Sequence, residues 1–195
     1  TFGADYMQSL WSAFKQVSAD GRLYKDSRVV PWCPKCGTGL SSHELAQGYE
    51  DVKDLSITAK FELTDEPGTY LLAWTTTPWT LPGNIALAVG KDIAYGVYEK
   101  DKERVVLATE LAAQLPEGWS LIETRPGSAL VGKSYNPLYP FAQELASESE
   151  KVKFDKAYQV YAADFVTTED GTGIVHTAVM YGQDDFELGN AVGLP

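Results

Sequence analysis

The sequence predicts an α+β fold in which short strands form a barrel or sandwich with a few helices at its edge. From residue 56 onward, apolar runs of strand length alternate with turn sequences. Residues 5–19 instead repeat their apolar side chains at helical spacing. The chain has 195 residues, of which 44% are hydrophobic. This is enough for one core of ordinary size, with room for a small appendage.

The first expected element is an amphipathic helix over residues 5–19. Asp5 and Gln8 are spaced for a capping box, and Gly21 follows as a stop signal. The apolar residues of this segment would share one face of the helix: Tyr6, Leu10, Phe14 and Val17. That face is expected to point toward a core.

Six strands are expected after residue 56: 57–63, 70–76, 85–89, 93–99, 105–108 and 158–163. Turn sequences separate most of them, such as those at 66–68, 82–84 and 100–102. Residues 109–115 are expected to form a short helix that ends at Pro116. Residues 142–156 are rich in Glu, Ser and Lys and are expected to form a solvated connection.

Residues 71–89, LLAWTTTPWTLPGNIALAV, have the pattern of a binding site between two buried strands. Thr75, Thr76 and Thr77 stand at a strand end, where Pro78 removes a backbone donor and discourages further pairing. Their hydroxyls and amides would then be available to a ligand. The alternative is that the threonines only favour a strand and that the Pro-Gly sequence only forms a turn.

Three blocks of the sequence resemble one family. TTTPWTLPGN, residues 75–84, resembles the threonine-rich peptide of the editing domain of isoleucyl-tRNA synthetase, a large insertion in that enzyme's catalytic fold. The related valyl and leucyl enzymes usually carry arginine where Thr77 stands. Residues 171–195 resemble the family's other active-site segment, with His176 and Asp185 nine apart as in the family. Residues 127–141 resemble a third family segment.

The resemblance implies a β-barrel-like editing domain with short peripheral helices, preceded by a stem that contains a helix and a zinc-knuckle turn. Residues 1–50 would be the stem and residues 51–195 the editing domain. Isoleucine and valine differ by one methylene, and this pair in this enzyme is the established example of a difference that a hydrophobic pocket discriminates by only about 1–3 kcal/mol. An editing site must therefore hydrolyse valyl-tRNA(Ile) while it excludes isoleucine. Hydrolysis of valyl-adenylate as well is left open.

Two residues of the 171–195 block have chemical roles in this interpretation. Asp185 would accept the ammonium of the aminoacyl ester in a charge-assisted hydrogen bond. Asp184 is the rival, and without the family either aspartate reads as a negative charge at the start of a helix over residues 186–191. His176, reached through a glycine-rich strand, would form a wall of the amino-acid pocket or orient water. Without the resemblance, a lone histidine is more often a core residue whose hydrogen bonds are satisfied within the fold.

The threonine-rich block would hold the rest of the substrate. Thr75, Thr76 and Thr77 would bind the terminal adenosine and the ester, orient water and stabilise the developing charge, and no covalent threonine is expected. The resemblance also assigns Trp79 to substrate binding. Asn84 would fix the turn or bind substrate.

Cys33 and Cys36 flank Pro-Lys in a turn of zinc-knuckle type. A tetrahedral zinc site needs four ligands, and His43 could supply at most a third. In related synthetases a second cysteine pair follows the editing domain, so the resemblance implies half of a zinc site whose other half is not in this chain. Editing itself would need no cofactor. Two free thiols in a turn are the alternative.

The net charge of −11 argues against tight binding of a nucleic-acid backbone by this chain alone. The resemblance implies that the 3′ end of valine-charged tRNA(Ile) is the partner, together with the remainder of the synthetase. No apolar run approaches 18 residues and no signal peptide is recognisable, so we expect a cytoplasmic protein with no membrane partner. The synthetase's ATP-binding motifs are absent. A noncatalytic tRNA 3′-end docking module of a valyl-type or leucyl-type synthetase is the alternative function.

Overall fold

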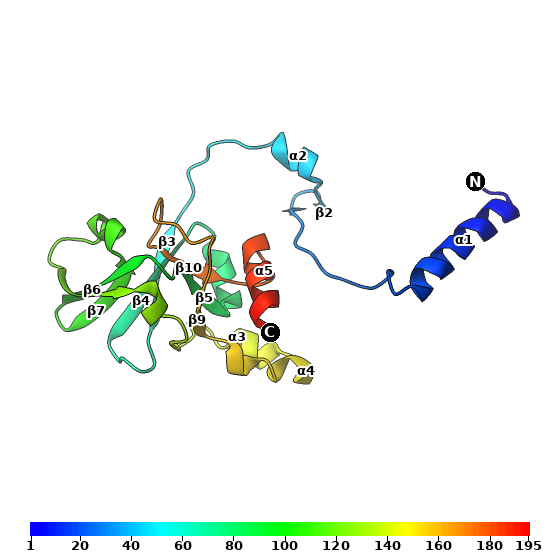
Figure 1. Ribbon diagram of the computed structural model, residues 1–195. Helices are drawn as coiled ribbons and strands as arrows, with labels where there is room; N and C mark the ends of the chain where they lie inside the picture. Colours follow the sequence, from blue (N-terminus) through cyan, green and yellow to red (C-terminus); the bar gives the residue numbers. More distant parts are fainter.

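The computed structural model describes residues 1–195 and has a globular body with a long N-terminal arm (Figure 1). The arm contains α1 (Ala4–Ala19), a hairpin of β1 (Trp32–Cys33) and β2 (Thr38–Gly39), and the single-turn helix α2 (Ser42–Ala46). The first buried residue along the chain is Ala59, in the first strand of the body. The hydrophobic core is therefore built without the arm.

The helix expected at 5–19 is confirmed as α1, but two expectations about it are wrong. Its N-cap is Gly3 with no side-chain cap, so Asp5 and Gln8 form no capping box. Asp5 lies inside the first turn, where its carbonyl accepts from Ser9 Oγ at 2.8 Å. The apolar face covers no core, because α1 has no buried residue and Trp11 is 71% exposed.

Two sheets form the body. The larger combines β3 (Ile57–Glu62), β4 (Thr69–Thr75), β6 (Ala94–Lys100), β7 (Glu103–Ala108) and β8 (Ser120–Pro126) in the order β3-β4-β7-β6-β8. The smaller combines β5 (Ala86–Val89), β9 (Gln159–Ala162) and β10 (Ile174–Thr177) in the order β10-β5-β9. The pairs β4–β7 and β5–β9 are parallel, and all other neighbours are antiparallel.

One core joins the two sheets. It contains Phe61, Leu71, Val97 and Leu107 from the larger sheet, together with Leu87 and Ile174 from the smaller. The α+β class is confirmed, and the strands form separate sheets that share a core, without closing into a barrel. The six expected strands correspond to β3, β4, β5, β6, β7 and β9. β8 was not predicted, because this edge strand has no buried residue and so lacks the apolar alternation that marks a half-buried strand.

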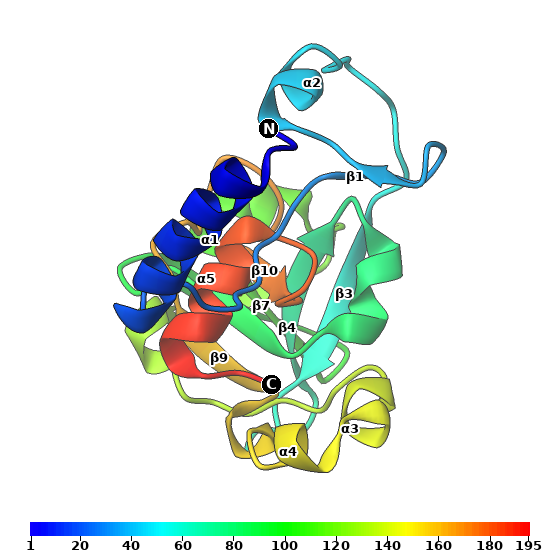
Figure 2. The same cartoon turned by 90° about the vertical axis from the view of Figure 1, so that its right-hand side faces the viewer.

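Short helices fill the connections. These short elements are η1 (Pro78–Gly83), η2 (Thr109–Gln114), η3 (Gly127–Ala129), α3 (Phe141–Leu145), α4 (Glu148–Lys151) and η4 (Phe154–Lys156). The helix expected at 109–115 is thus a 3-10 helix. Residues 142–156 are mostly exposed, as expected, but they contain helical turns, of which α4 begins with a capping box of Ser147 and Glu150. Figures 1 and 2 both place α3 and α4 at the end of the body opposite α2.

The last helix, α5 (Gln183–Val192), extends the expected 186–191 helix at both ends and stops at Gly193, whose φ is +75°. It lies on the side of the body that faces the arm (Figure 1). No helix of the structure is both long enough and apolar enough to cross a membrane.

The approach of β10 to β4 brings the two halves of the site together. Gly171 allows this approach, because its φ is +71° and a Cβ there would lie 3.1 Å from Trp74 Cε3 in β4. Gly173 likewise brings the start of β10 close to Ala108 at the end of β7. Tyr95 holds the glycine segment before β10, since its hydroxyl donates to the carbonyl of Gly173 at 2.6 Å. The end of β4 at Thr75 therefore faces the end of β10 at His176.

Candidate active site

A cavity of about 250 Å³ lies where β4 and η1 meet β10 and the start of α5. Five of the residues predicted from the sequence line it: Thr75, Thr77, Trp79, His176 and Asp185. The other lining residues are Thr80, Ala178 and Tyr181. Two chain segments about one hundred residues apart therefore supply one concave site.

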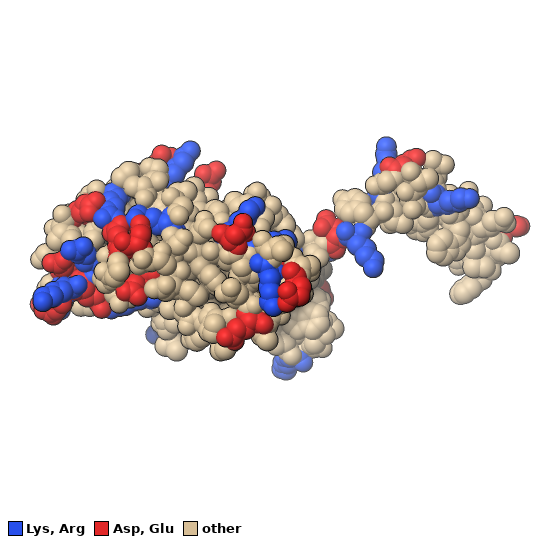
Figure 3. Space-filling view, turned by 90° about the horizontal axis from the view of Figure 1, so that it is seen from below, with Lys and Arg blue, Asp and Glu red and all other residues tan.

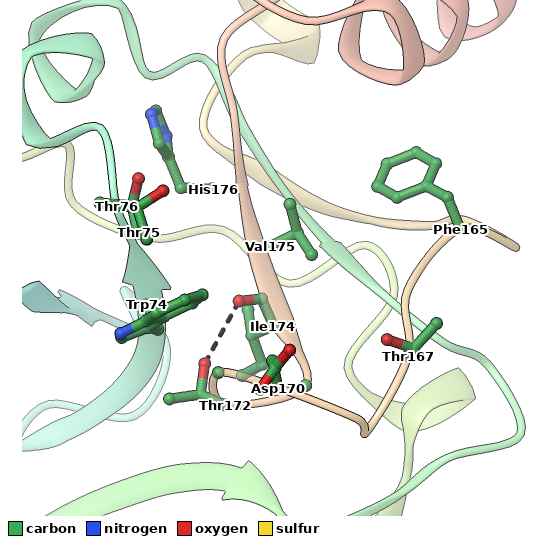
Figure 4. A pocket seen from close by; sticks show the side chains of 12 residues that line it. Trp74, Thr75, Thr76, Phe165, Thr167, Asp170, Thr172, Ile174, Val175 and His176 are labelled. Atoms are coloured by element: carbon green, nitrogen blue, oxygen red, sulfur yellow. Dashed lines mark hydrogen bonds between the residues drawn. The ribbon is translucent and has the colours of Figure 1, made fainter. Parts of the chain in front are cut away.

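A second hollow of about 270 Å³ adjoins the first, and Thr75 and His176 line both. Thr76 faces this second hollow together with Trp74 and Phe165. Figure 4 shows Thr75, Thr76 and His176 at one end of it and Phe165 at the other. The three threonines therefore divide between two neighbouring hollows.

The threonine hydroxyls bond to one another and to the backbone. Thr75 Oγ1 lies 3.2 Å from Thr77 Oγ1 and accepts from the backbone N–H of Thr77 at 3.1 Å. The amide of Thr77 is therefore not free, contrary to the expectation from Pro78. Thr80 Oγ1 donates to the carbonyl of Thr77 at 2.8 Å. These bonds hold the turn in one conformation and present its hydroxyls to the cavity.

His176 is only 8% exposed, and both ring nitrogens have partners. Nε2 lies 3.0 Å from Thr80 Oγ1 and Nδ1 lies 2.9 Å from Asn84 Nδ2. Burial lowers the pKa of His176 to about 4, so the ring is neutral at pH 7. Its polar partners are a hydroxyl and an amide, so it forms no histidine–carboxylate pair of the kind found in a serine-protease triad.

Asp185 lies in the first turn of α5. Loss of solvation raises its pKa to about 6, and the neighbouring Asp184 charge adds to that effect, whereas a hydrogen bond from the backbone of Ala178 opposes it. Gly182 leaves room for the carboxylate, since a Cβ there would lie 2.8 Å from Asp185 Oδ2. Asp184 is exposed and does not line the cavity. Both aspartates have the helix-start position considered above, and only Asp185 also faces the site.

Asn84 lies behind His176, away from the cavity wall. It is 5% exposed, and its amide contacts His176, the carbonyl of Ala86 and the hydroxyl of Tyr135. Sequence reasoning did not assign Tyr135, Thr80 or Tyr181 to the site. All three lie within blocks that resemble the family, but their roles depend on contacts that the chain order does not reveal.

Cys33 and Cys36 lie in the β1–β2 hairpin of the arm. The backbone N–H of Cys36 donates to Cys33 Sγ at 3.2 Å, and hydrogen bonds from Cys36 lower the pKa of Cys33. This geometry suits a thiolate ligand. No cluster of three or more His, Cys, Asp or Glu side chains could hold a metal ion, so His43 does not complete a site with these cysteines.

Residues 1–179 match the family model of the class I tRNA synthetases (I, L, M and V). The chain belongs to this family. The isoleucine–tRNA ligase of Clostridium novyi is 45% identical over 196 residues, which cover 100% of this chain and 18% of that protein. The ligase of Thermoplasma acidophilum is 46% identical over 194 residues, which cover 100% of this chain and 18% of that protein. The chain thus spans about a fifth of the length of the curated relatives that it matches.

Solved structures agree on the fold. The crystal structure of GlLeuRS-CP1 superposes with a TM-score of 0.57 at 21% identity and covers 71% of this chain and 60% of that chain. The editing domain of the cytosolic leucyl-tRNA synthetase of P. knowlesi superposes with a TM-score of 0.51 at 13% identity and covers 72% of this chain and 63% of that chain. The synthetase segment described here therefore has the fold of an editing domain.

Proposed function

We propose that this segment hydrolyses misacylated valyl-tRNA(Ile) and excludes isoleucine by size. The observation that carries the proposal is the single cavity of about 250 Å³ in which Asp185, His176 and the threonine-rich turn meet. An anion, a pair of hydroxyls and a firmly held ring in one concave site are the groups that ester hydrolysis of an aminoacyl substrate requires.

Asp185 would bind the ammonium of the aminoacyl group. With a pKa of about 6 its carboxyl is mostly ionised at pH 7, and a cation that entered the cavity would favour the ionised form further. A charge-assisted hydrogen bond at this point would place the ester carbon beside the threonine hydroxyls. Asp185 would thus fix the amino group of the substrate, and the position of the ester would follow from that contact.

Thr75 and Thr77 would orient the attacking water and stabilise the charge that develops on the ester. Their hydroxyls lie 3.2 Å apart on the cavity wall, so one molecule can contact both. His176 would form the wall that limits the side chain of the amino acid. Both of its nitrogens are engaged, Nε2 by Thr80 and Nδ1 by Asn84, so the ring is not the base that deprotonates water.

The tRNA itself would be held mainly by other parts of the synthetase. Residues 1–50 contain five basic and five acidic side chains, so the net charge of −11 lies on residues 51–195. Figure 3 shows acidic and basic side chains interspersed on the visible face of the body, without a large basic patch. Trp79 and Tyr181 are 65% and 55% exposed at the cavity and offer rings on which unpaired bases could stack.

Deacylation of valyl-tRNA(Ile) and isoleucyl-tRNA(Ile) by the chain tests the proposal. We expect release of valine well above the rate without protein and little release of isoleucine. The alternative is a noncatalytic module that docks the tRNA 3′ end. Binding of the tRNA without any release of valine would favour the module and refute the hydrolase.

We also propose that Cys33 and Cys36 contribute two of the four ligands of a structural zinc ion. Two features of the turn suit such a role: the backbone N–H of Cys36 donates to Cys33 Sγ, and Cys36 is exposed. The remaining ligands would come from outside this chain. The ion would stabilise the arm, and no step of the hydrolysis would involve it.

A further inference from the structure

A continuous chain of hydrogen bonds runs from the core to the wall of the candidate active site. It begins at the hydroxyl of Tyr135, which is 2% exposed and lies 2.6 Å from Asn84 Oδ1. It continues from Asn84 to His176 at 2.9 Å and from His176 to Thr80 at 3.0 Å. It ends where Thr80 donates to the carbonyl of Thr77 at 2.8 Å.

The order of donors in this chain can be worked out from its two ends. A phenol hydroxyl has one hydrogen, and at 2.6 Å from Asn84 Oδ1 it donates to that oxygen. The amide nitrogen of Asn84 therefore faces the other way, where it donates to the carbonyl of Ala86 at 2.9 Å and to His176 Nδ1. A carbonyl cannot donate, so the contact with Ala86 requires this same orientation of the amide.

The other end gives the same answer. The single hydroxyl hydrogen of Thr80 is directed to the carbonyl of Thr77, so its oxygen is left to accept from His176 Nε2. His176 Nδ1 must accept and Nε2 must carry the proton. Both ends thus require the neutral Nε2–H tautomer, and every donor in the chain has an acceptor.

We propose that Tyr135 and Asn84 form a positioning pair that sets the tautomer of His176 and thereby the direction of the Thr80 hydroxyl at the site. Tyr135 lines neither hollow of the site, so it acts there only through Asn84. The reverse orientation of the amide would place Asn84 Oδ1 against the Ala86 carbonyl and would require the proton on Nδ1. Nε2 would then accept from Thr80, whose hydroxyl would leave Thr77.

Nuclear magnetic resonance of the ¹⁵N-labelled chain at pH 7 tests this pair directly. The chain has two histidines, and His43 lies in the arm as an internal reference. We expect the Nε2–H pattern for His176. Tyr135→Phe removes one hydrogen bond and should lower the ratio of Nε2–H to Nδ1–H by about two- to tenfold, the factor that corresponds to the net worth of such a bond.

Tyr158→Phe is the matched control. Its ring packs 6.1 Å from the ring of Tyr135, and its hydroxyl bonds to no member of the chain from Tyr135 to Thr77. It should leave the His176 pattern unchanged. An unchanged ratio in Tyr135→Phe, or an equal change in both variants, would overturn the proposal.

Asn84→Asp is a stronger perturbation, because a carboxylate can only accept from the ring. It should place a proton on His176 Nδ1, and retention of the original Nε2–H pattern in the folded variant would also overturn the proposal. A second arm, which rests on the proposed function, compares valyl with isoleucyl ester hydrolysis. Tyr135→Phe should reduce that preference while Tyr158→Phe retains it. If the unmodified chain hydrolyses neither ester, the proposed function fails and the resonance measurement still decides the positioning pair.

Discussion

Asp185→Asn should weaken editing and stabilise the fold at the same time. The carboxyl has a pKa of about 6 in the folded chain, against an ordinary value of 3.8. Taken in full, that difference corresponds to about 3 kcal/mol of destabilisation by the ionised carboxyl at pH 7. The carboxyl is partly exposed, so we expect about 1–2 kcal/mol after solvent screening. Asparagine keeps the shape and an acceptor without the charge.

The sign of the pH dependence follows from the raised pKa. Well below the ordinary pKa of 3.8 the carboxyl is neutral in both the folded and the unfolded chain, so it does not change the free energy of unfolding. Between the ordinary pKa of 3.8 and the folded pKa of about 6, the unfolded chain ionises while the folded chain keeps the proton, so the unmodified protein loses stability that Asp185→Asn retains. The melting temperatures should therefore agree at about pH 3 and differ by about 2–8 °C at pH 7, with the variant higher.

Activity should change in the opposite direction. Loss of a charge-assisted hydrogen bond costs about 1.5–3 kcal/mol, which is roughly a ten- to hundredfold decrease in kcat/KM for valyl-tRNA(Ile). In the unmodified chain kcat/KM should rise with pH as Asp185 ionises near pH 6. Asp184→Asn is the control, because that exposed side chain does not line the cavity. Retained deacylation in Asp185→Asn, or a lowered melt at pH 7, would refute the reasoning.

Three further predictions concern the cavity and the arm. Trp79→Ala should raise the KM for valyl-tRNA about tenfold, since stacking is worth about 1–3 kcal/mol per base, and should have little effect on hydrolysis of a valyl ester of adenosine alone. The control is Trp11→Ala on α1, where the side chain is 71% exposed, and it should change neither KM. Thr77→Ala and His176→Ala should enlarge the cavity and increase release of isoleucine from isoleucyl-tRNA(Ile). An unchanged preference for the valyl ester in both variants would show that these residues do not line the selective pocket. The Cys33–Cys36 turn should bind zinc weakly and below one equivalent, as measured by metal analysis after dialysis, and tight one-to-one binding would contradict a half site.

Residues that share a short stretch of chain could be assigned from the sequence because local chemistry determines their arrangement. The threonine-rich turn is an example: proline ends the strand, and neighbouring hydroxyls bond to the nearby backbone whatever the distant fold. The start of α5 and the helix α1 are further examples. β8 could not be found in this way, because an exposed edge strand has no apolar alternation to detect.

The role of each side chain within the site depended on long-range contacts. Asp184 and Asp185 are adjacent and chemically identical, yet only one is turned into the cavity, where loss of solvation changes its pKa. The distinction comes from the packing of α5 on the segment that follows β10, where Gly189 approaches Val179, and the chain order does not specify this packing. Asn84 is a candidate substrate ligand in the sequence, but in the structure it bonds to His176 behind the cavity wall. This contact, too, depends on long-range packing.

The sequence by itself determined the family, the α+β class and the two segments that carry the chemistry, because these depend on residue identity, apolar periodicity and local turn chemistry. Only the tertiary structure decided that β4 and β10 meet, that His176 has both nitrogens engaged, and that Tyr135 lies behind it. Burial removes water as a partner, so a polar group inside the fold must bond to whichever side chain packs against it. That neighbour is set by the packing of strands far apart in the chain.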